Sequence, residues 1–560
     1  MTHARKLDAG WWRHAVVYQV YPRSFADSDG DGIGDIPGII DRLDYLHDLG
    51  VDAVWISPFY SSPLHDGGYD VADYRAVDPR LGCLSDVDRL IAEAHERGLR
   101  VIMDIVPNHT SSEHVWFRQL LDDGPTSTSA DRYIVRKGRG PDHSQPPNNW
   151  KSVFHGSGWS RIPAADGNLT DYWYLHLFDV TQPDLNWENA DVRAEFRDTL
   201  RFWFDRGIDG FRIDVAHGLV KDPDLPDMDE SENDPVLLGG DMPYAPYWDQ
   251  DGVHDVYREW RAVADEYTPP RIFCGETWVP NPERLARYQR SDELHTSFNF
   301  DYVLAGWNAE RLKTSIDNTI LWHDRVGAPP TWVLSNHDVI RHRTRLAPGF
   351  DPQHALTCRV DEVRGLQRAR AATLFTMALP GSMYLYQGEE VGLPEVRDLD
   401  AGVRQDPAWL RSAGTDGFRD GCRVPIPWSG DQPSYGFGPT TRSWLPQPTE
   451  WAELSVERER GQADSTLAMY MSALAMRRHH TALGEGPLEW LEVGSDVLVF
   501  RRGSDTQSVV CALNLGTSHH HLDPAWGIDV LMASGPDVIE LDEDSRAHLV
   551  IGGETCVWIG

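Results

Sequence analysis

The stretch Ile36–Ile56, which reads IPGIIDRLDYLHDLGVDAVWI, decides the fold. Apolar residues recur at a helical period over Ile36–Leu49, and Ala53–Ile56 is a short apolar strand. Similar strands stand on either side, at Val16–Val20 before this helix and at Arg100–Val106 after a second helix. Strands that alternate with amphipathic helices in this way predict a parallel sheet covered by helices.

The alternation of strands and helices resumes further along the chain. Together with the three strands above, the later candidates make eight, which is the number in a (β/α)8 TIM barrel. We therefore predict an α/β protein built on such a barrel. The five later candidates are Ile208–Ile213, Arg271–Cys274, Thr296–Phe300, Trp332–Ser335 and Met383–Tyr386.

Two irregular stretches interrupt the barrel, and a different pattern follows it. Residues 111–171 are rich in Gly, Pro, Asn and Ser and predict a loop-rich subdomain, inserted after the third strand. Residues 388–455 predict a second excursion. Short strands separated by turn residues predict an antiparallel, β-sandwich-like domain over residues 483–560. The catalytic barrel is expected to comprise residues 1–110 and 172–482.

The composition limits the possible partners. A formal net charge of −35 repels phosphate backbones and anionic lipid surfaces, so neither nucleic acid nor a membrane is expected, whereas a small neutral oligosaccharide meets no such repulsion. The six cysteines lack zinc-binding spacings, and their scarcity favours a reducing compartment. The chain shows no apolar run of about 18 residues and no signal core near Met1. We expect a cytoplasmic monomer or homodimer.

Acidic residues follow several predicted strands at their carboxyl ends, which gather at one rim of a barrel. Among them are Asp214, Glu276 and Asp338. Glycoside cleavage needs one carboxylate to attack the anomeric carbon and a second to donate a proton to the leaving oxygen. Arg212 shares a strand face with Asp214 and would keep it ionised, as a nucleophile requires. Glu276 would then carry the raised pKa of the acid.

Four of these strand ends resemble the core motifs of the α-amylase superfamily of glycoside hydrolases. They read DIVPNH (Asp104–His109), GFRIDVAH (Gly210–His217), GETW (Gly275–Trp278) and SNHD (Ser335–Asp338). The resemblance covers nearly the whole chain. It implies Asp214 as nucleophile, Glu276 as general acid/base and Asp338 as transition-state stabiliser, with sugar contacts from Arg212, His109 and His337.

Further motifs are similar to the oligo-1,6-glucosidase and α-glucosidase branch. They are WWRHAVVYQVYPRSFADSDGDGIGD (Trp11–Asp35), GGYDVADY (Gly67–Tyr74), QPDLNW (Gln182–Trp187) and RDGCRVPIPW (Arg419–Trp428). This resemblance implies a retaining, exo-acting α-glucosidase that removes terminal glucose from short oligosaccharides. It also implies that Tyr69 stacks on the terminal glucose, that Asp70 and Arg423 bind it, and that Phe178 and Gln182 line the pocket.

Three further questions concern the glycosidic linkage that is cleaved, the fate of the glucosyl group, and whether the protein is catalytic at all. Val215 follows the nucleophile, as in relatives with α-1,6 action, whereas RDGCRVPIPW is closer to enzymes acting on maltose-like sugars, so the linkage stays open. A transglucosidase or sugar isomerase on the same scaffold is the alternative, because a covalent glucosyl intermediate allows either outcome. A non-catalytic relative is disfavoured because all three acids are present.

An acidic loop begins like a calcium-binding loop. Oxygen ligands are spaced at alternate positions through Asp27, Asp29, Asp31, the Ile33 carbonyl and Asp35, with a glycine at the sixth position. The twelfth position is Gly38, so the bidentate glutamate of an EF-hand is missing. We expect one structural Ca²⁺ or Mg²⁺ here and no cofactor for the chemistry.

Overall fold

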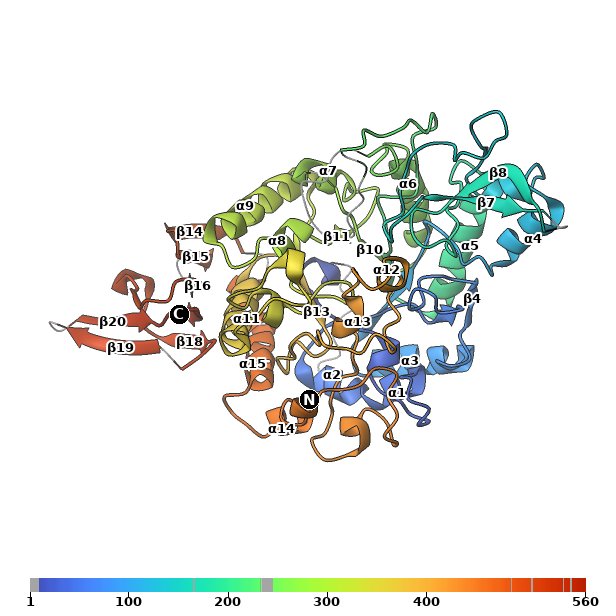
Figure 1. The fold of residues 1–560 in the computed structure, drawn as a ribbon. Coiled ribbons are helices and arrows are strands. Elements are labelled where there is room, and N and C mark those ends of the chain that lie inside the picture. Colours follow the sequence, from blue (N-terminus) through green and yellow to red (C-terminus); the bar gives the residue numbers. More distant parts are fainter. Residues whose placement is uncertain are drawn as a thin grey trace.

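The computed structural model describes residues 10–164, 167–231, 233, 245–279, 281–484, 486–504, 507–536, 538–543 and 546–560. Eight parallel strands pair in the order β11-β10-β9-β5-β2-β1-β13-β12 and form the barrel at the centre of Figure 1. The predicted TIM barrel is therefore confirmed. The strands are β1 (Val16–Val20), β2 (Ala53–Ile56), β5 (Arg100–Ile105), β9 (Gly210–Ile213), β10 (Ile272–Gly275), β11 (Thr296–Ser297), β12 (Thr331–Val333) and β13 (Ser382–Tyr386).

The sixth strand is shorter than predicted. β11 ends at Ser297, and helix α8 begins at Phe300, which the prediction had placed in the strand. The side chain of Asn299 accepts a hydrogen bond from the Tyr302 backbone nitrogen and so caps the new helix. Asn299 and Phe300 therefore belong to the start of helix α8 and not to the end of the predicted strand.

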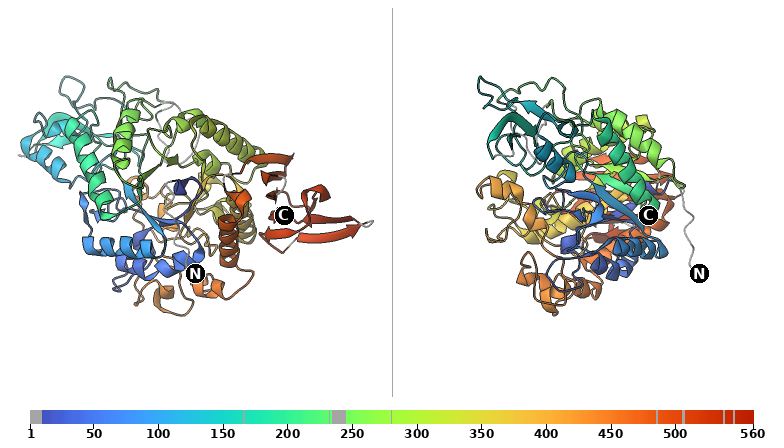
Figure 2. Two further views of the ribbon diagram at one scale, coloured as in Figure 1. Left: turned by 180° about the vertical axis from the view of Figure 1, so that it is seen from behind. Right: turned by 90° about the vertical axis from the view of Figure 1, so that its right-hand side faces the viewer.

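The helices pack around the barrel, as both views in Figure 2 show. The predicted single helix Ile36–Leu49 is in fact two helices, because the backbone leaves helical geometry at Arg42. The outer helices are α1 (Ile36–Asp41), α2 (Leu43–Leu49), α3 (Leu84–Glu96), α5 (Ala190–Arg206), α6 (Val253–Ala264), α7 (Pro282–Arg287), α8 (Phe300–Leu304), α9 (Ala309–Val326), α10 (His342–Arg345), α11 (Glu362–Ala378) and α15 (Thr466–His479).

The inserted segment forms its own small sheet at one side of the barrel (Figure 1). It begins with helix α4 (Val115–Asp123), which the sequence reasoning missed. Strands β6 (Val135–Lys137), β7 (Trp159–Pro163) and β8 (Leu169–Leu175) then pair antiparallel in the order β6-β8-β7. Strand β8 continues past the predicted boundary at residue 171. The short strands β3 (Tyr60–Ser61) and β4 (Asp73–Val77) pair separately.

The predicted C-terminal antiparallel domain is present at the opposite side of the barrel (Figures 1 and 2). One sheet has the order β14-β15-β16-β21-β18, and a second has the order β17-β20-β19. Buried Glu554 accepts hydrogen bonds from Arg364 and Arg368 of α11 and so ties this domain to the barrel. The strands are β14 (Leu488–Val493), β15 (Val497–Ser504), β16 (Gln507–Asn514), β17 (His520–His521), β18 (Val530–Ala533), β19 (Val538–Glu543), β20 (Arg546–Ile551) and β21 (Thr555–Ile559).

The segment after β13 is irregular, as predicted, and lies over the carboxyl end of the barrel. Its short helices are α12 (Pro407–Arg411), α13 (Arg419–Cys422) and α14 (Val456–Arg460). In the described ranges, no helix has both the length and the apolar character needed to span a bilayer.

Candidate active site

A cavity opens at the carboxyl ends of the barrel strands. Including its mouth, the space between the lining side chains is about 670 Å³. The three acids predicted to be catalytic, from three different strand ends, all line it. The lining residues are Asp66, Tyr69, His109, Val153, Phe178, Asp214, Val215, His217, Trp248, Glu276, Trp278, Asp338 and Arg419.

Arg212 connects the acids from beneath. It lies on β9, and its side chain has no solvent exposure. Its Nη1 donates to Asp214 Oδ1 at 2.8 Å, and its Nη2 donates to Glu276 Oε2 at 2.5 Å. Nη1 also donates to both oxygens of Asp104, at 3.0 and 3.1 Å. The arginine therefore holds the carboxylates from behind and is not among the residues that line the cavity, whereas the resemblance implied a direct sugar contact.

The protonation of the acids differs from the prediction that Arg212 would simply keep Asp214 ionised. Burial raises the pKa of Asp214 well above its ordinary value, and although Arg212 opposes this shift, neighbouring Glu276 and Asp104 add to it. Burial likewise raises the pKa of Asp104 to about 7. Carboxylates this close cannot all be ionised, so the cluster retains a proton near neutral pH.

Glu276 is held on both oxygens. Its Oε2 accepts from the Val215 backbone nitrogen at 3.2 Å as well as from Arg212, and its Oε1 accepts from Trp278 Nε1 at 3.2 Å. Val215 adopts a φ of 44°, which is strained for a β-branched residue. The strained turn directs a backbone N–H at Glu276, and it places the Val215 side chain in the cavity wall.

Asp338 follows strand β12 and is surrounded by positive charge. Arg423 Nη2 donates to its Oδ1 at 2.8 Å, and Arg419 Nη1 does so at 3.3 Å. Burial would raise the pKa of Asp338, but His337, Arg423 and Arg419 together hold it well below its ordinary value. Asp338 is therefore an ionised carboxylate, as the stabiliser of a cationic transition state must be.

His337 and Tyr69 form a stack beside Asp338. Their ring centroids lie 5.1 Å apart at an interplanar angle of 6°. His337 is fully buried and receives a hydrogen bond on Nδ1 from Gln19 Nε2 at 2.7 Å, which leaves its Nε2 directed at Asp338 Oδ2, 3.0 Å away. Tyr69 faces the cavity and donates to Asp104 Oδ2 at 2.9 Å.

Asp70, a predicted sugar contact, does not line the cavity, whereas its neighbour Asp66 does. Asp70 is completely buried, and its carboxylate accepts from Ser62 Oγ and from the backbone nitrogens of His65 and Asp66. It therefore shapes the turn and does not reach the cavity. Asp66, which sequence reasoning missed, lines the cavity instead.

A similar exchange occurs between two arginines at the ends of helix α13. Arg423 does not line the cavity, and it acts on Asp338 and the His337 carbonyl from behind. Arg419 lines the cavity and donates to Asp66 Oδ1 at 3.0 Å and to Asp406 Oδ1 at 2.9 Å. The two arginines lie one helical turn apart, so the motif alone does not distinguish their roles.

His109 and Gln182 complete the polar end of the cavity. His109 lines the cavity, and burial lowers its pKa to about 4, so its imidazole is neutral at pH 7. Gln182 is buried behind it, and its Nε2 donates to Asp66 Oδ2 at 3.1 Å. Gln182 therefore positions Asp66 and does not line the cavity as the resemblance implied.

Five of the lining residues have apolar or aromatic side chains, namely Val153, Phe178, Val215, Trp248 and Trp278. Phe178 and Val215 were predicted to line the pocket. No sequence pattern pointed to Trp248, because it follows β9 in a long segment without helical or strand periodicity.

The acidic loop gathers three of its five predicted ligands. Carboxylate oxygens of Asp27, Asp29 and Asp35 all lie within 4.8 Å of one another. Asp31 instead accepts a hydrogen bond from the Ile33 backbone nitrogen at 2.7 Å. A Cβ on Gly38 would lie 2.2 Å from the Ala26 carbonyl oxygen, which explains why no glutamate occupies that position. Clustered carboxylates suit a hard divalent cation, so the loop fits Ca²⁺ or Mg²⁺.

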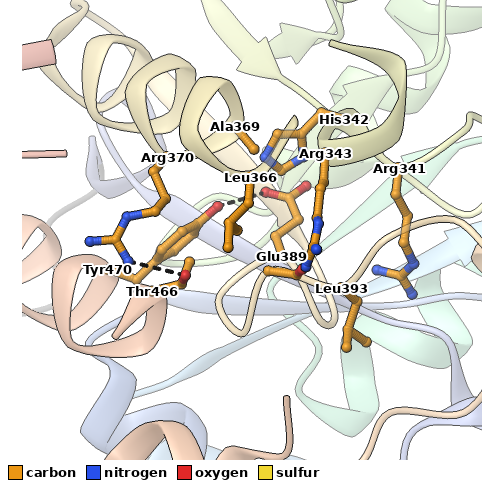
Figure 3. A pocket seen from close by; sticks show the side chains of 11 residues that line it. Arg341, His342, Arg343, Leu366, Ala369, Arg370, Glu389, Leu393, Thr466 and Tyr470 are labelled. Carbon is orange, nitrogen blue, oxygen red and sulfur yellow. Dashed lines mark hydrogen bonds between the residues drawn. The ribbon is translucent and has the colours of Figure 1, made fainter. Parts of the chain in front are cut away.

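A second, smaller cavity lies away from the catalytic acids, between α10, α11, α15 and the loop after β13 (Figure 3). Glu389 sits among its labelled side chains and accepts hydrogen bonds from the Tyr386 backbone nitrogen at 3.1 Å and the Tyr470 hydroxyl at 3.5 Å. Burial raises the pKa of Glu389 to about 8.

The model of the alpha amylase catalytic domain matches residues 19–486. The chain belongs to the alpha-amylase family. The predicted resemblance is thereby confirmed, and this alpha-amylase family member is a glycoside hydrolase. Three curated relatives have similar lengths. They are a probable alpha-glucosidase of Rhizobium meliloti (36% identical over 91% of this chain and 90% of the relative), an oligo-1,6-glucosidase of Parageobacillus thermoglucosidasius (34%, 88% and 88%) and a trehalose-6-phosphate hydrolase of Escherichia coli (34%, 90% and 91%).

Solved structures of the alpha-amylase family agree with the fold. The alpha-glucosyl transfer enzyme XgtA superimposes with a TM-score of 0.84 at 35% identity, over 98% of this chain and 99% of that one. The similarity therefore includes the inserted subdomain and the C-terminal sheets as well as the barrel.

Proposed function

We propose that this glycoside hydrolase is a retaining, exo-acting α-glucosidase that releases terminal glucose from short, neutral oligosaccharides. The observation that carries the proposal is the single cavity that contains Asp214, Glu276 and Asp338, with Arg212 bonded to the first two. A nucleophile, an acid and an ionised stabiliser are the groups that double displacement needs.

In the first step, a carboxylate oxygen of Asp214 attacks the anomeric carbon while Glu276 gives its proton to the departing glycosidic oxygen. Arg212 keeps both carboxylates in place, and the retained proton of the cluster supplies the acid. Asp338 faces the positive charge that develops on the sugar ring. In the second step, the oxygen of a water molecule attacks the anomeric carbon while Glu276 takes its proton, so the bond from that carbon to the Asp214 oxygen breaks and glucose is released.

The polar end of the cavity supports exo action. Arg419 joins Asp66 to Asp338 and to Asp406, and Gln182 fixes the other oxygen of Asp66. We infer that these bonds close the cavity beyond the expected position of the terminal sugar. We infer that Asp66, His109 and Arg419 bind its hydroxyls and that Tyr69 stacks against its ring.

The charges that line the cavity favour a neutral substrate over a phosphorylated one. Four lining residues are carboxylates, and the lining guanidinium, Arg419, is already bonded to Asp66, Asp338 and Asp406. Among the described residues that line the cavity, a sugar phosphate would meet these carboxylates and no free cation to bind it. A substrate like that named for the trehalose-6-phosphate hydrolase is therefore not proposed here.

Transfer of glucose to another hydroxyl is the second candidate, because the similar structure XgtA is named an alpha-glucosyl transfer enzyme. The two candidates share the glucosyl ester on Asp214 and differ in what attacks it.

A product time course on maltose, isomaltose, trehalose and sucrose tests the proposal. It should show release of glucose from maltose, isomaltose or both. The Asp214→Asn variant should be slower by several powers of ten. Each tenfold loss of rate corresponds to a rise of about 1.4 kcal/mol in the activation free energy. Equal rates for the variant and the wild type would contradict the proposal.

We also propose that Asp27, Asp29 and Asp35 hold one structural Ca²⁺ or Mg²⁺. The ion would fix the loop that precedes α1 and would take no part in the chemistry. The convergence of their three carboxylates supports this assignment.

A further inference from the structure

The second cavity, drawn in Figure 3, is lined by more positive than negative charge. Arg341 directly precedes helix α10, Arg343 lies within it, and Arg370 belongs to α11. Among the described lining residues, Glu389 is the only acid. His342 also lines the cavity, but burial lowers its pKa to about 3, so it is neutral at pH 7. In the described part of the chain, no residue lines both this cavity and the one that contains the catalytic acids.

Arg341 is a buried cation whose side chain has no acidic partner among the described residues. It is almost completely buried, and its Nη1 and Nη2 donate to the carbonyl oxygens of Gln387 and Cys422, both at 2.8 Å. Within the described ranges, its Nε has no hydrogen-bond partner. Carbonyl oxygens satisfy N–H groups but do not cancel a full positive charge, so Arg341 brings an uncompensated cation into the protein interior.

The other two arginines are only weakly compensated. Arg370 donates from Nε to the Ser534 carbonyl at 2.7 Å and from Nη1 to Thr466 Oγ1 at 3.2 Å, and both acceptors are neutral. Arg343 has one carboxylate nearby, that of Glu362, whose Oε2 lies 3.4 Å from its Nε. Burial lowers the pKa of both arginines, which is the direction expected for cations with too little negative charge around them.

Glu389 does not supply the missing negative charge. It accepts hydrogen bonds from the Tyr386 backbone nitrogen and the Tyr470 hydroxyl, and Figure 3 draws none to it from the arginines. Its pKa of about 8 leaves it mostly protonated at pH 7. Glu395 accepts from the Arg341 backbone nitrogen, and burial raises its pKa to about 8 as well. Neither acid therefore neutralises the lining arginines near neutral pH.

The size and lining of the cavity indicate the kind of ligand that it can hold. The free space between the lining side chains accommodates roughly one water-sized particle. A monatomic anion fits this space, whereas phosphate or sulfate is too large. Leu366, Ala369 and Leu393 also line the cavity, and such apolar surface favours a weakly hydrated halide over a strongly hydrated ion.

We propose that this cavity is a binding site for a monatomic anion, with chloride as the occupant, held between Arg341, Arg343 and Arg370. The site goes beyond the proposed glucosidase activity and does not rest on it. The anion joins α10 and α11 to the loop after β13, and the bond from Arg370 to Ser534 extends this connection to the C-terminal domain. An ion that binds only the folded state stabilises it, so chloride should stabilise the folded chain.

A thermal-shift titration of the full-length protein tests for the site. The protein is first freed of chloride, and sodium chloride or sodium gluconate is then added at matched ionic strength. The melting temperature should rise with chloride until the site is filled, and it should rise less with gluconate, whose anion is too large for the cavity. The net charge of −35 repels anions from the protein surface, so non-specific chloride binding contributes little to the difference.

Bromide locates the site directly, because it can replace chloride and scatters X-rays anomalously. Crystals of the full-length protein soaked in sodium bromide should show an anomalous peak between Arg341, Arg343 and Arg370. This measurement does not depend on whether any variant folds.

Matched variants connect the binding to the cavity. Arg370→Gln removes a lining guanidinium and should weaken chloride binding by about tenfold to 10²-fold, the range for one lost hydrogen bond to a charged group. Arg364→Gln makes the same change on the same helix, at a residue that pairs with Glu554 outside the cavity lining, and should leave the affinity unchanged. Glu389→Gln should leave the affinity within about threefold at pH 7, because the native acid is already mostly protonated there.

Each of four results would overturn the proposal. Equal melting temperatures in chloride and gluconate would show that the folded protein has no such site. A bromide map without a peak in this cavity, or equal chloride affinities of the Arg370→Gln and Arg364→Gln variants, would place any binding elsewhere. Chloride binding that appears only in Glu389→Gln would show that ionised Glu389 is itself the counter-ion. The proposed glucosidase function is unaffected by all four.

Discussion

Arg212 Nη1 lies 2.8 Å from Asp214 Oδ1, and the guanidinium group is wholly shielded from solvent. The two residues are two positions apart at the end of β9, so the alternation of the strand places both side chains on one face. A buried arginine with several carboxylate partners is expensive to replace, since its removal leaves their charges unpaired. This pair is therefore central to both the structure and the chemistry of the site.

Arg212→Lys should lower kcat/KM for maltose or isomaltose by about 10²-fold to 10³-fold or more, the range found when one stabilising donor is lost. A lysine ammonium lacks the planar fork that reaches Asp214 and Glu276 together. Steady-state kinetics would measure the loss, and circular dichroism would show that the variant is folded. An activity within about tenfold of the wild type would mean that one point charge is sufficient.

Asp66 and Asp70 provide a matched pair of variants. Asp66→Ala should lower kcat/KM by about 10²-fold, because it removes a proposed partner of the sugar hydroxyls and one of the three carboxylates that hold Arg419. Asp70→Ala should mainly lower the melting temperature, because its carboxylate satisfies three donors within the turn. The reverse result, with catalysis sensitive to Asp70 and insensitive to Asp66, would restore the assignment made from sequence.

The strand ends could be predicted from sequence because a barrel brings them to one rim regardless of the loops. Asp214, Glu276 and Asp338 accordingly line one cavity. The choice between Asp66 and Asp70 could not be predicted. It depends on a turn that Asp70 itself organises through hydrogen bonds to the backbone, and no periodicity encodes such a turn.

Helix α13 and the segment after β9 show the same limit. Arg419 and Arg423 stand at the two ends of one helical turn, and only the packing of that turn on the barrel decides which one faces the cavity. Trp248 reaches the cavity from a long connection without a repeating pattern. Burial of Asp214 among other acids also depends on the assembled site, so its raised pKa could not be foreseen from its neighbour Arg212 alone.

Removal of divalent cations should lower the melting temperature if Asp27, Asp29 and Asp35 hold an ion. A ligand that binds only the folded state stabilises it, so EDTA should destabilise the protein and added Ca²⁺ or Mg²⁺ should restore it. Differential scanning fluorimetry measures this shift. The Asp27→Asn variant should respond to neither treatment. A melting temperature that EDTA leaves unchanged, in protein shown by elemental analysis to have lost its metal, would contradict the assignment.

Glu389→Gln should stabilise the protein at high pH. The folded state raises the pKa of Glu389 from 4.5 to about 8, so it favours the protonated form. Stability from this group is complete below the unfolded pKa and is lost as the pH rises towards about 8. Glutamine imitates the protonated form at every pH. The melting temperature of the variant should therefore exceed that of the wild type at pH 9 and fall within about 1 °C of it at pH 4.5. A variant less stable than the wild type at pH 9 would show that the folded protein favours the ionised form of Glu389, which would contradict the raised pKa.

The covalent ester between glucose and Asp214 is the central claim, and trapping it is the most direct test. A 5-fluoro-α-glucosyl fluoride forms the ester but slows its hydrolysis, because fluorine destabilises the cationic transition state. After proteolysis, mass spectrometry should find the sugar on the peptide that contains Asp214, and the Asp214→Asn protein should carry none. A label on another acid, or turnover with inverted anomeric configuration and no label, would contradict the account.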